Sequence, residues 1–484
     1  MTNKFYITTP IYYVNASPHI GHAYTTLAAD IIARFYRQEN REVFFLTGTD
    51  EHGAKIVRAA IPADVINHFP KGSLRVSRDD KNLIKQFTDK ISQEFKDAWK
   101  ELDIKYDYFI RTTDKNHEKF VSDFLQKLYD KGDIYEGIYE GLYCVGCEEY
   151  KKFEDLIDGK CPLHKTRVEK IQEKVYFFKL SKYQDEIIEL IQTDKIEILP
   201  TNRKNEVLGF LKQKIEDTAI SRSQVEWGIP VPWDPSQTIY VWVDALLNYL
   251  SAVNNSRILE FSNSQLSELW PPDLQLIGKD ILRFHAVIWP GLLLSAEYDL
   301  PKKIFVHGFF TVNGQKMSKS LNNVITSSEL IERYGVDATR YLLISAYPFG
   351  NDGDFSIAEL DKKYNADLSN GLGNLVQRAI VLAQKFKVEF IEKKLSASVE
   401  LNDYFENVNF TEAINFIKKN INNANKFVND TKPWETGDKY IIAELLQKIA
   451  QIAIDLKPFI PSTCERILAQ LKTRKPEILF PKII

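Results

Sequence analysis

The sequence predicts an α/β protein with a doubly wound parallel sheet, an inserted domain that interrupts the sheet, and an all-helical bundle that follows it. Three observations lead to this prediction. A strand, a glycine-containing turn, a helix and a strand open the chain, similar signals return from Thr238 to Val306, and helical periodicity with few glycines dominates after Asp361. With 484 residues the chain is too long for one compact core, so we expect several packed units.

The N-terminal segment has the pattern of a nucleotide-binding, Rossmann-type layer. Phe5–Thr9 and Glu42–Thr47 are short and rich in β-branched and aromatic residues, which predicts strands. Between them, apolar residues recur at helical spacing from His22 to Gln38. We therefore assign residues 1–114 to the first half of the sheet domain and residues 226–325, which carry the second group of signals, to its other half.

The rest of the chain divides into an insertion and a helical tail. Residues 115–225 contain a cluster of cysteines and are expected to form an inserted connective domain. Residues 326–360 are expected to link the sheet domain to a bundle of amphipathic helices over residues 361–484. The segment 61–82 holds prolines, a glycine and mixed charges without a clear period, which predicts a surface loop.

The composition limits the classes of function. The chain is 44% hydrophobic and 27% charged, as soluble globular proteins are. Its first residues do not resemble a signal peptide, and its most apolar run, Ala286–Ala296, contains Pro290 and is too short to span a bilayer. We therefore expect a cytoplasmic protein without a membrane partner. The net charge of -3 gives no bulk attraction to a polyanion, so an RNA partner would have to meet a local basic face.

The first of two phosphate-handling motifs is Pro18-His19-Ile20-Gly21-His22, where the first predicted strand gives way to a helix. Gly21 lets an adenine nucleotide lie close to the backbone, and the N-terminus of the helix offers N–H groups to anions. His19 and His22 are three residues apart on the first turn, so both can donate hydrogen bonds to phosphates in the transition state. Taken alone, the motif also fits two surface histidines that cap a helix.

The second motif is Lys316-Met317-Ser318-Lys319-Ser320. It follows the turn signal Asn313-Gly314, so we expect its lysines on a mobile loop. Such a loop can close over a triphosphate and bring Lys316 and Lys319 to the charge that develops on the pyrophosphate leaving group. Removal of one such charged contact typically raises the barrier by roughly 3 kcal/mol.

In this order and at this separation, the two motifs resemble the signature of class I aminoacyl-tRNA synthetases. Further segments resemble the methionyl branch, and the likeness extends over nearly the whole chain: Thr9-Pro10-Ile11-Tyr12-Tyr13-Val14-Asn15, Thr47-Gly48-Thr49-Asp50-Glu51-His52-Gly53, Tyr240-Val241-Trp242-Val243-Asp244-Ala245 and Ile277-Gly278-Lys279-Asp280-Ile281. The stretch from Gly53 to Tyr106 is longer than the family usually shows, which supports an insertion at 61–82. The chain ends after the helical region, without the extension that some members carry, so we expect a monomer.

The resemblance implies a two-step reaction. L-Methionine and ATP would give methionyl-adenylate and pyrophosphate, with Mg²⁺ accompanying ATP. The methionyl group would then pass to the 3′-terminal adenosine of initiator and elongator tRNA(Met). No covalent intermediate with the enzyme is needed, because catalysis depends on positioning and on neutralising charge.

The resemblance also assigns residues to two binding sites. The ATP site would contain the histidine and lysine motifs and three less decisive positions, for which a core or exposed role stays open: His19, Gly21, His22, Lys316 and Lys319, with Lys279, Asp280 and His307. Asp50 would take the ammonium group of methionine. The walls around the methionine side chain would be aromatic, which suits a thioether, and each aromatic taken alone also fits core packing: Tyr13, Trp242, Tyr249 and His285, completed by Ile11, Ala245, Leu246 and Ile281.

The cysteine cluster predicts a structural zinc site. Cys144 and Cys147 are followed by Cys161 and His164 in a C-x₂-C-x₁₃-C-x₂-H arrangement over residues 144–164. Two such pairs can fill the tetrahedral coordination of one zinc ion, and no open position remains for catalysis. The ion would stabilise a subdomain too small for its own core. Zinc knuckles in the inserted domain are also typical of the family that the chain resembles.

The helical region has candidate contacts for the anticodon. Asn370, Asn374 and Arg378 recur every four residues and are expected on one helical face, where amides can pair with base edges. Trp434 offers an indole for stacking on an unpaired base, although a buried aromatic at a helix end is the alternative. All four match family positions that recognise the CAU anticodon.

Three other functions are compatible with parts of the pattern. Synthetases for leucine, isoleucine and valine generally carry a large editing insertion, for which this chain has no room. Cysteinyl enzymes hold zinc in the active site, whereas the cysteines of this chain are compactly paired. A nucleotidyltransferase that does not use tRNA also has an H-x-G-H motif, but the helical tail and Trp434 argue against it. A non-enzymatic RNA-binding relative would not need the intact lysine motif.

Overall fold

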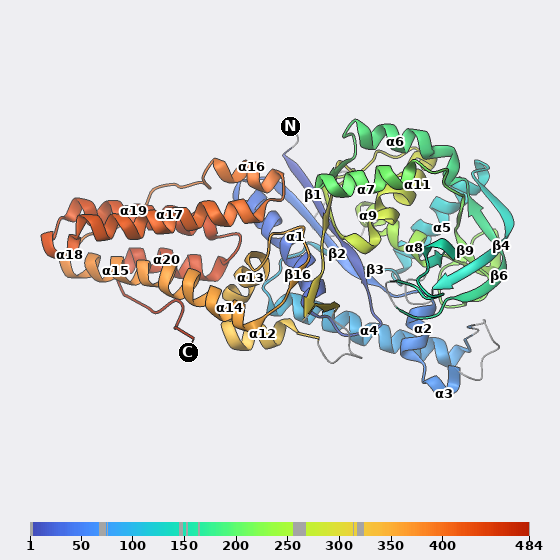
Figure 1. Ribbon diagram of the computed structural model, residues 1–484, viewed down its shortest axis with the longest axis horizontal. Helices are drawn as coiled ribbons and strands as arrows, with labels where there is room; N and C mark the ends of the chain where they lie inside the picture. The colour runs from blue at the N-terminus through green and yellow to red at the C-terminus, as the bar shows by residue number, and fades with distance from the viewer. Residues whose placement is uncertain are drawn as a thin grey trace.

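A six-stranded parallel sheet forms the centre of the molecule (Figure 1). The computed structural model describes residues 3–66, 74, 76–144, 149–151, 153–162, 165–254, 268–312, 314–316 and 324–483. In spatial order the strands of the central sheet are β3 (Tyr108–Arg111), β2 (Glu42–Asp50), β1 (Lys4–Tyr13), β12 (Leu274–Gly278), β13 (Lys303–His307) and β7 (Glu197–Leu199), and all neighbours run parallel.

Strands β1 and β2 confirm the predicted opening of the chain and are longer than expected. Instead of ending at Thr9 and Thr47, they continue to Tyr13 and Asp50. The two strands keep pairing after a shift in register, so that Tyr13 lies opposite Asp50. The added residues carry the carboxyl ends of both strands to the edge of the sheet where ligands bind in such folds.

Helices cover both faces of the sheet, which makes it doubly wound as predicted. In the central strand β1, Phe5 and Ile7 pack into one core and Tyr6 into the other, because alternate side chains of a strand point to opposite faces. One core includes helices α1 (Ile20–Gln38), α4 (Arg78–Glu101) and α13 (Val336–Ser345) and continues into the helical region. The other includes α5 (Lys115–Asp130), α9 (Asn248–Val253) and α11 (Trp289–Ala296).

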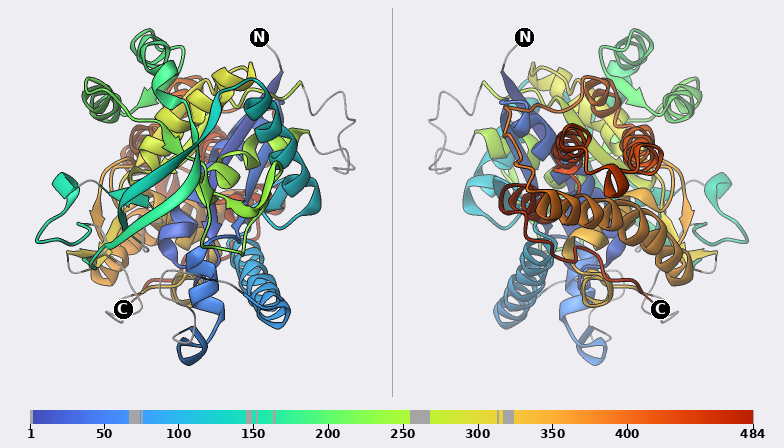
Figure 2. Two further views of the ribbon diagram at one scale, coloured as in Figure 1. Left: turned by 90° about the vertical axis from the view of Figure 1, so that its right-hand side faces the viewer. Right: turned by 90° about the vertical axis from the view of Figure 1, so that its left-hand side faces the viewer.

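The expected inserted domain, 115–225, is only partly a separate unit. Its body is an antiparallel four-stranded sheet at one end of the molecule, in the order β5 (Glu149–Lys151), β4 (Ile134–Cys144), β6 (Glu169–Phe178) and β8 (Thr218–Ala219) (Figures 1 and 2). However, β7 pairs in parallel with β13, with Ile198 opposite Ile304, and forms an edge of the central sheet. The predicted boundaries therefore assigned one strand of the main sheet to the insertion, since a three-residue strand gives almost no sequence signal.

The segment 61–82 is not a surface loop throughout, so that prediction is wrong at both of its ends. Helix α3 (Ala63–Ile66) lies near its start, and α4 begins at Arg78. The start of α4 is fixed by a capping box, in which Ser77 Oγ accepts from the N–H of Asp80 at 3.1 Å and Asp80 Oδ2 accepts from the N–H of Ser77 at 2.9 Å. Residues 67–73 and 75 lie outside the described part of the chain.

The predicted link, 326–360, is folded. Helices α12 (Ser327–Tyr334) and α13 pack against α4 and α1, because Leu330, Tyr334 and Leu342 are buried in the same core as those helices. Buried Arg340 on α13 joins the sheet domain to the helical region. Its guanidinium donates to Asp30 Oδ2 on α1 at 2.7 Å and to the carbonyl of Phe459 at 3.0 Å.

The helical region follows as predicted, starting slightly earlier than Asp361. Helix α14 (Ile357–Lys363) runs directly into a π-helical stretch, η6 (Tyr364–Gly373), and then into α15 (Asn374–Phe386). The bundle is completed by α16 (Glu400–Glu406), α17 (Phe410–Thr431), α18 (Pro433–Thr436), α19 (Lys439–Leu456) and α20 (Pro461–Thr473). It extends away from the sheet domain, with α18 at its far end (Figure 1; end-on in Figure 2, right).

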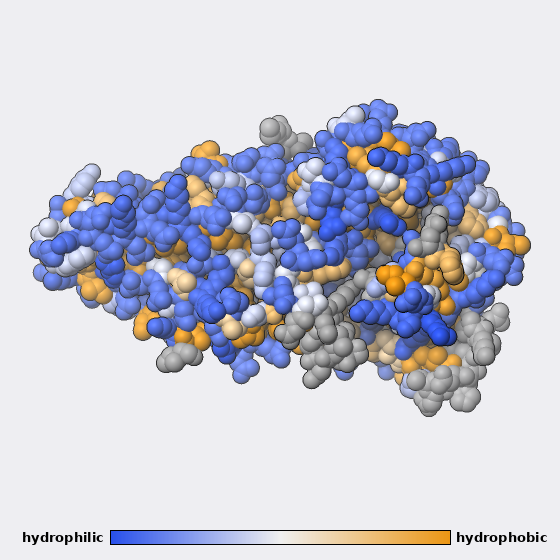
Figure 3. Space-filling view, viewed as in Figure 1, coloured by the Kyte–Doolittle hydropathy of each residue, from blue (hydrophilic) through white to orange (hydrophobic). Residues whose placement is uncertain are grey.

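The remaining elements are short. Two small sheets consist of β9 (Ser221–Arg222), β10 (Pro230–Val231) and β11 (Asp234–Ile239), and of β14 (Phe310–Val312), β15 (Gln315–Lys316) and β16 (Gly353–Asp354). Short helices are α2 (Ala54–Ala60), α6 (Gln184–Gln192), α7 (Thr201–Leu211) and α8 (Val241–Leu246). Within the described residues, no helix is long and apolar enough to cross a membrane. The face drawn in Figure 3 is mainly hydrophilic, with hydrophobic residues in scattered groups.

Candidate active site

His19 and His22 form the N-terminus of helix α1, as the motif predicted. Nδ1 of His19 accepts a hydrogen bond from the N–H of Gly21 at 3.0 Å, and Nδ1 of His22 accepts from the N–H of His19 at 3.3 Å. In a neutral imidazole the proton then sits on Nε2, so both rings present an Nε2–H donor. The rings stack with centroids 3.9 Å apart. Two parallel donors at a helix N-terminus suit a phosphate chain.

The chain contacts the start of helix α1 a few residues after the lysine motif. Lys316 ends strand β15, which pairs with β14, and Met317 to Ser320, including Lys319, lie outside the described residues. After the motif the chain returns to α1, where the carbonyl of Ile325 accepts a hydrogen bond from the N–H of Ile20 at 3.1 Å. Ile325, which follows the lysine motif, is thus joined by a backbone hydrogen bond to Ile20 in the histidine motif, about 300 residues earlier in the sequence.

The three less decisive ATP candidates lie at the carboxyl ends of β12 and β13. Lys279 Nζ is ion-paired with Asp352 Oδ2 at 2.6 Å, and Asp280 is exposed beside it. His307 is buried, and both of its ring nitrogens are used: Nδ1 donates to the carbonyl of Gly308 at 2.8 Å, and Nε2 accepts from the hydroxyl of Thr25 at 2.7 Å. Burial lowers the pKa of His307, so the ring is neutral and ties β13 to α1.

Asp50 and Tyr13 lie side by side at the carboxyl ends of neighbouring strands. Asp50 is 2% exposed, and its carbonyl accepts from the N–H of Val14 at 3.2 Å. The next residue, Glu51, is held by Arg111 through two hydrogen bonds of 2.6 and 2.8 Å, and its carbonyl accepts from the indole of Trp227 at 2.6 Å. The backbone on both sides of the Asp50 carboxylate is therefore fixed.

The predicted aromatic walls come together next to Tyr13. The ring of Trp242, on α8, lies 6.0 Å from that of Tyr13 in an edge-to-face arrangement. Trp242 also stacks on Phe284 at 3.9 Å with nearly parallel planes. Sequence reasoning missed Phe284, although it immediately precedes His285 in the chain. Ile11 on β1, and Ala245 and Leu246 on α8, belong to the same elements.

Tyr249 and His285 are joined by a short hydrogen bond. The carbonyl of Ile281 can only accept, so Nδ1 of His285 donates to it at 3.0 Å, and Nε2 accepts from the hydroxyl of Tyr249 at 2.7 Å. Burial lowers the pKa of His285 to about 4, and the bond to Ile281 offsets this only in part. The ring is neutral near pH 7, so this wall of the pocket is polar but uncharged. His285 lies in a π-helical stretch, η4 (Phe284–Ile288), a distortion that is frequent at functional sites.

Two of the four predicted zinc ligands, Cys147 and His164, lie outside the described residues. The other two are buried, and Cys144 lies at the end of β4. The N–H of Lys165 donates to the carbonyl of Cys161 at 2.7 Å. Among the described residues, no group of three or more His, Cys, Asp or Glu side chains is arranged to hold a metal ion.

The predicted anticodon residues lie on the helical region. Asn370 and Asn374 are exposed, but Asn370 belongs to the π-helical stretch η6, so the expected spacing of four residues per turn holds only from Asn374 to Arg378 in α15. The guanidinium of Arg378 lies 5.6 Å from the ring centre of Trp434 and donates to Asn429 Oδ1 at 2.8 Å. Trp434 is 39% exposed, so it is not the buried helix-end aromatic of the alternative interpretation.

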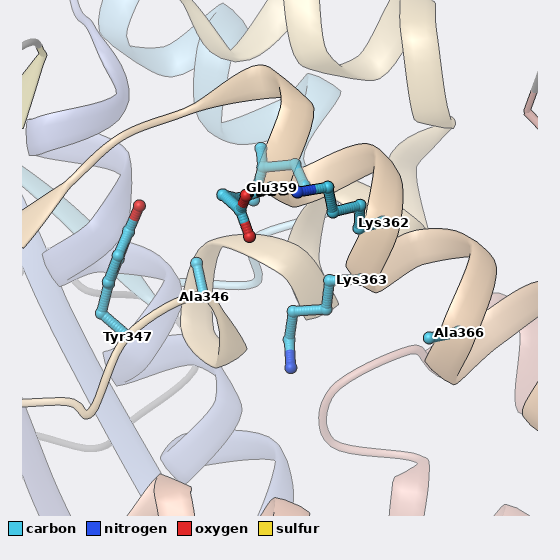
Figure 4. Close-up of a pocket in the computed structure, with 7 residues that line it drawn as sticks. Ala346, Tyr347, Glu359, Lys362, Lys363 and Ala366 are labelled. Carbon is cyan, nitrogen blue, oxygen red and sulfur yellow. Dashed lines mark hydrogen bonds and ion pairs between the residues drawn. The ribbon is translucent and has the colours of Figure 1, made fainter.

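A cavity of about 340 Å³ lies outside this site, at the end of α13 and along α14 (Figure 4). None of the predicted site residues lines it; its walls are Ala346, Tyr347, Glu359, Leu360, Lys362, Lys363 and Ala366. Lys362 is ion-paired with Glu359 at 2.8 Å, and Lys363 with Asp367 at 2.9 Å. Because both lysines are paired with adjacent acids, we assign the cavity no ligand.

Comparison with known proteins identifies the family. The model of the class I tRNA synthetases, group M, matches residues 5–380. The chain is 42% identical over 497 residues to the methionine–tRNA ligase of Thermotoga maritima, which covers 97% of this chain and 75% of that protein. It is 41% identical over 508 residues to that of Rickettsia bellii, covering 99% and 95%. The chain belongs to the methionine–tRNA ligases of class I.

Solved structures of this family agree with the fold. Mycobacterium tuberculosis methionyl-tRNA synthetase in complex with methionyl-adenylate aligns with a TM-score of 0.85 at 33% identity, covering 100% of this chain and 99% of that one. Its apo form aligns with a TM-score of 0.79 at 31% identity, with the same coverage. The methionine–tRNA ligases thus share both the Rossmann-type parallel sheet and the C-terminal helical region described above.

Proposed function

We propose that the residues at the carboxyl edge of the central sheet carry the two half-reactions of a methionine–tRNA ligase. They form methionyl-adenylate from L-methionine and ATP, and then transfer the methionyl group to the 3′-terminal adenosine of initiator and elongator tRNA(Met). The observation that carries the proposal is that Asp50 lies opposite Tyr13, which in turn contacts Trp242. A carboxylate for an ammonium group thus adjoins aromatic rings for a thioether.

Asp50 receives the ammonium group of methionine, and the aromatic walls receive its side chain. The buried carboxylate is held by a fixed backbone, so little ordering is needed when the ligand binds. Tyr13 and Trp242 offer ring edges and faces to the sulfur. The neutral pair formed by Tyr249 and His285 closes the pocket without a charge, which favours methionine over acidic or basic side chains. Ile11, Ala245, Leu246 and Ile281 complete the apolar lining.

His19 and His22 hold the phosphates of ATP, and Gly21 allows the nucleotide to approach the backbone. An oxygen of the methionine carboxylate attacks the α-phosphorus, the bond from this phosphorus to the bridging oxygen breaks, and pyrophosphate leaves. The Nε2–H groups of both histidines stabilise the charge that develops on the phosphates. Lys316 and Lys319 neutralise the pyrophosphate, and Mg²⁺ accompanies ATP as part of the substrate.

Lys279, Asp280 and His307 surround the nucleotide in this proposal. Because both ring nitrogens of His307 bind protein groups, its role is to hold β13 against α1. In the second half-reaction a hydroxyl of the terminal adenosine attacks the acyl carbon, and AMP leaves with the electron pair of the broken bond. No residue forms a covalent intermediate, so the rate acceleration comes from positioning the substrates.

Asn370, Asn374, Arg378 and Trp434 recognise the anticodon of tRNA(Met). The support is that Arg378 and Trp434, which are more than 50 residues apart in the sequence, lie together at the end of the bundle away from the sheet. A guanidinium and an exposed indole suit a phosphate and an unpaired base. In this proposal the protein acts as a monomer in the cytoplasm.

Cys144, Cys147, Cys161 and His164 hold one structural zinc ion in this proposal. The buried thiols of Cys144 and Cys161 fit a closed site, and the ion would cross-link a domain with little core of its own. Metal analysis of protein purified without chelators tests the assignment. About one equivalent of zinc per chain is expected, and less than about half an equivalent contradicts it.

Amino-acid-dependent pyrophosphate exchange across the standard amino acids tests the proposed function. Exchange with methionine alone is expected, since the pocket is apolar with one carboxylate for the ammonium group. Exchange that depends on another amino acid would overturn the substrate assignment. Exchange with methionine but no charging of tRNA(Met) would overturn the second half-reaction.

A further inference from the structure

A chain of buried hydrogen bonds lies behind the proposed methionine pocket. His52 Nδ1 donates to Asp244 Oδ2 at 2.7 Å, and His117 Nε2 donates to Asp244 Oδ1 at 2.7 Å. Nδ1 of His117 is 2.7 Å from the hydroxyl of Ser251. All four side chains are buried, none more than 5% exposed. We call these four residues the buried histidine cluster.

Two members of the cluster lie on the helices that carry the aromatic walls. Asp244 follows Trp242 by two residues on α8, and Ser251 follows Tyr249 by two residues on α9. Residues two apart on an α-helix point roughly 200° apart. When Trp242 and Tyr249 face the pocket, Asp244 and Ser251 therefore face the opposite side, where they meet the histidines.

The histidines connect these helices to the end of the sheet. His52 follows Asp50 by two residues, just after β2, and its backbone continues from the fixed Glu51. His117 lies on the first turn of α5, which follows β3. The buried histidine cluster thus joins the strand end that carries Asp50 to both wall helices.

Asp244 is the centre of the cluster, and its chemistry makes the cluster sensitive to the loss of one partner. A carboxylate only accepts hydrogen bonds, so each imidazole nitrogen that faces it carries a hydrogen. Asp244 is 1% exposed, and within the described part of the chain its carboxylate has no other hydrogen-bond partner. Removal of one imidazole would leave the buried carboxylate of Asp244 with one of its two hydrogen-bond donors. The surrounding helices would then shift or admit water.

We propose that His52, Asp244 and His117 are positioning residues for methionine binding: they set the spacing between the Asp50 carboxylate and the aromatic walls, without contact with the substrate. The inference rests on the proposed methionine pocket. It extends that pocket to residues that sequence motifs alone gave no role. If these residues only stabilised the fold, their loss would weaken the binding of all substrates alike. If they position the pocket, their loss weakens the binding of methionine alone.

The test compares His52→Ala with His52→Asn in methionine-dependent pyrophosphate exchange by the full-length protein. An alanine removes the donor to Asp244, and we expect the KM for methionine to rise about tenfold or more while the KM for ATP stays within about twofold. The amide nitrogen of asparagine occupies nearly the position of Nδ1. His52→Asn should therefore restore the KM for methionine to within about threefold of the wild type.

Asp133→Asn is the matched control. Asp133 is also a buried carboxylate, 3% exposed, and it accepts hydrogen bonds from Lys182, Tyr183 and Ser295 away from the pocket. This variant should leave both KM values unchanged. An unchanged methionine KM in His52→Ala would overturn the proposal, and so would an equal rise for ATP or a failure of His52→Asn to restore binding.

His117→Gln gives an independent test if His52→Ala does not fold. The glutamine nitrogen keeps the donor to Asp244, but glutamine has no second ring nitrogen for Ser251, so only the connection to α9 is lost. We expect the KM for methionine to rise about threefold to fivefold with an unchanged KM for ATP. A soluble His117→Gln protein with the methionine KM of the wild type contradicts the proposal.

Failure of the proposed function would look different. If the pocket is assigned wrongly, the wild-type protein gives no methionine-dependent exchange, or Trp242→Ala leaves the KM for methionine unchanged. If only the inference fails, the wild type and Trp242→Ala behave as expected while His52→Ala matches the wild type.

Discussion

The two faces of the central sheet each contain a fully buried carboxylate, but the hydrogen-bond donors beside them differ. On one face, Asp30 of α1 receives hydrogen bonds from the guanidinium groups of Arg34 and Arg340, both at 2.7 Å. On the other face, Asp244 of α8 receives them from two imidazoles, also at 2.7 Å. The geometry is similar, and the chemistry of the donors is not.

The two clusters, with different donors, also join different parts of the molecule. Arg340 connects α1, whose N-terminus carries the proposed ATP-binding histidines, to the helical region that carries the proposed anticodon residues. A guanidinium stays charged throughout the physiological range, so this connection does not depend on pH. The buried histidine cluster instead connects elements of the proposed methionine site, and the pKa of its His52 is raised by Asp244 despite burial. The connection between domains is permanent, whereas the one behind the pocket responds to pH.

Arg340→Ala should have the largest effect on stability, because it removes the connection between the sheet domain and the helical region. The change leaves Asp30 with one guanidinium and removes donors from four carbonyl groups, so the free energy of unfolding should fall by roughly 3–5 kcal/mol. Urea denaturation of the full-length protein measures it. Arg333→Ala is the matched control, because Arg333 forms an exposed ion pair with Asp361, and its loss should cost at most about 1 kcal/mol. Equal losses for both variants would contradict a special role of Arg340.

Trp434→Ala should affect the proposed anticodon contact in the helical region and leave the proposed methionine site unchanged. Loss of a base-stacking surface worth roughly 1–3 kcal/mol should lower kcat/KM for tRNA(Met) about 5- to 150-fold. Methionine-dependent pyrophosphate exchange should be unchanged, because the indole lies in the helical region, away from the sheet. Trp434→Phe keeps a ring and should retain most of the charging. A loss of exchange together with charging would mean that Trp434 supports the fold.

A small pH effect should distinguish the two carboxylate clusters. Burial opposes the charge of His52, but Asp244, with Glu51 and Glu118 nearby, raises the pKa of His52 above its usual value. The two imidazoles hold the pKa of Asp244 below its usual value despite burial. The stability that His52 adds is therefore complete below about pH 6.5 and is lost as pH rises through its raised pKa. The contribution of Asp244 is lost only as pH falls below about 4.

Urea denaturation at pH 6 and pH 8 measures this effect. We expect wild-type stability to fall between these values through His52, because the folded protein holds the His52 proton more tightly than the unfolded chain does, and this advantage is lost as pH rises. His52→Asn cannot titrate at this position, so it should lose less over the same interval. The comparison with the variant cancels other titrating groups. If the wild type and His52→Asn lose the same stability, the pH-sensitive half of the comparison is wrong.

Much of the fold could be predicted because its signals are local. The strand, glycine turn and helix at residues 5–38 are read from alternation and helical spacing, and parallel strands bring Tyr13 and Asp50 to one edge. Elements with weak local signals were missed. Strand β7 has only three residues, and the π-helical stretches at Phe284–Ile288 and Tyr364–Gly373 depend on packing rather than on composition.

The residues that hold the site in place were less predictable than those that line it. His52 and Asp244 are 192 residues apart, and His117 and Asp244 are 127 apart, so no local pattern relates them. Both His52 and Asp244 stood inside recognised motifs, and this was the only available signal. The role of Arg340 could not be predicted for the same reason, because its partners lie on α1, after α4 and in the helical region, all more than 100 residues away in the sequence.

The central claim is that Asp50 recognises the ammonium group of methionine, and kinetic analysis of Asp50→Ala tests it most directly. The measurement is methionine-dependent pyrophosphate exchange, with binding of ATP followed separately. Because the loss of one partner of a buried charged pair typically costs roughly 2–5 kcal/mol, kcat/KM for methionine should fall by about 30-fold to several thousandfold. ATP binding should be kept. Near-normal exchange with methionine would contradict the assignment of Asp50 and of the pocket around it.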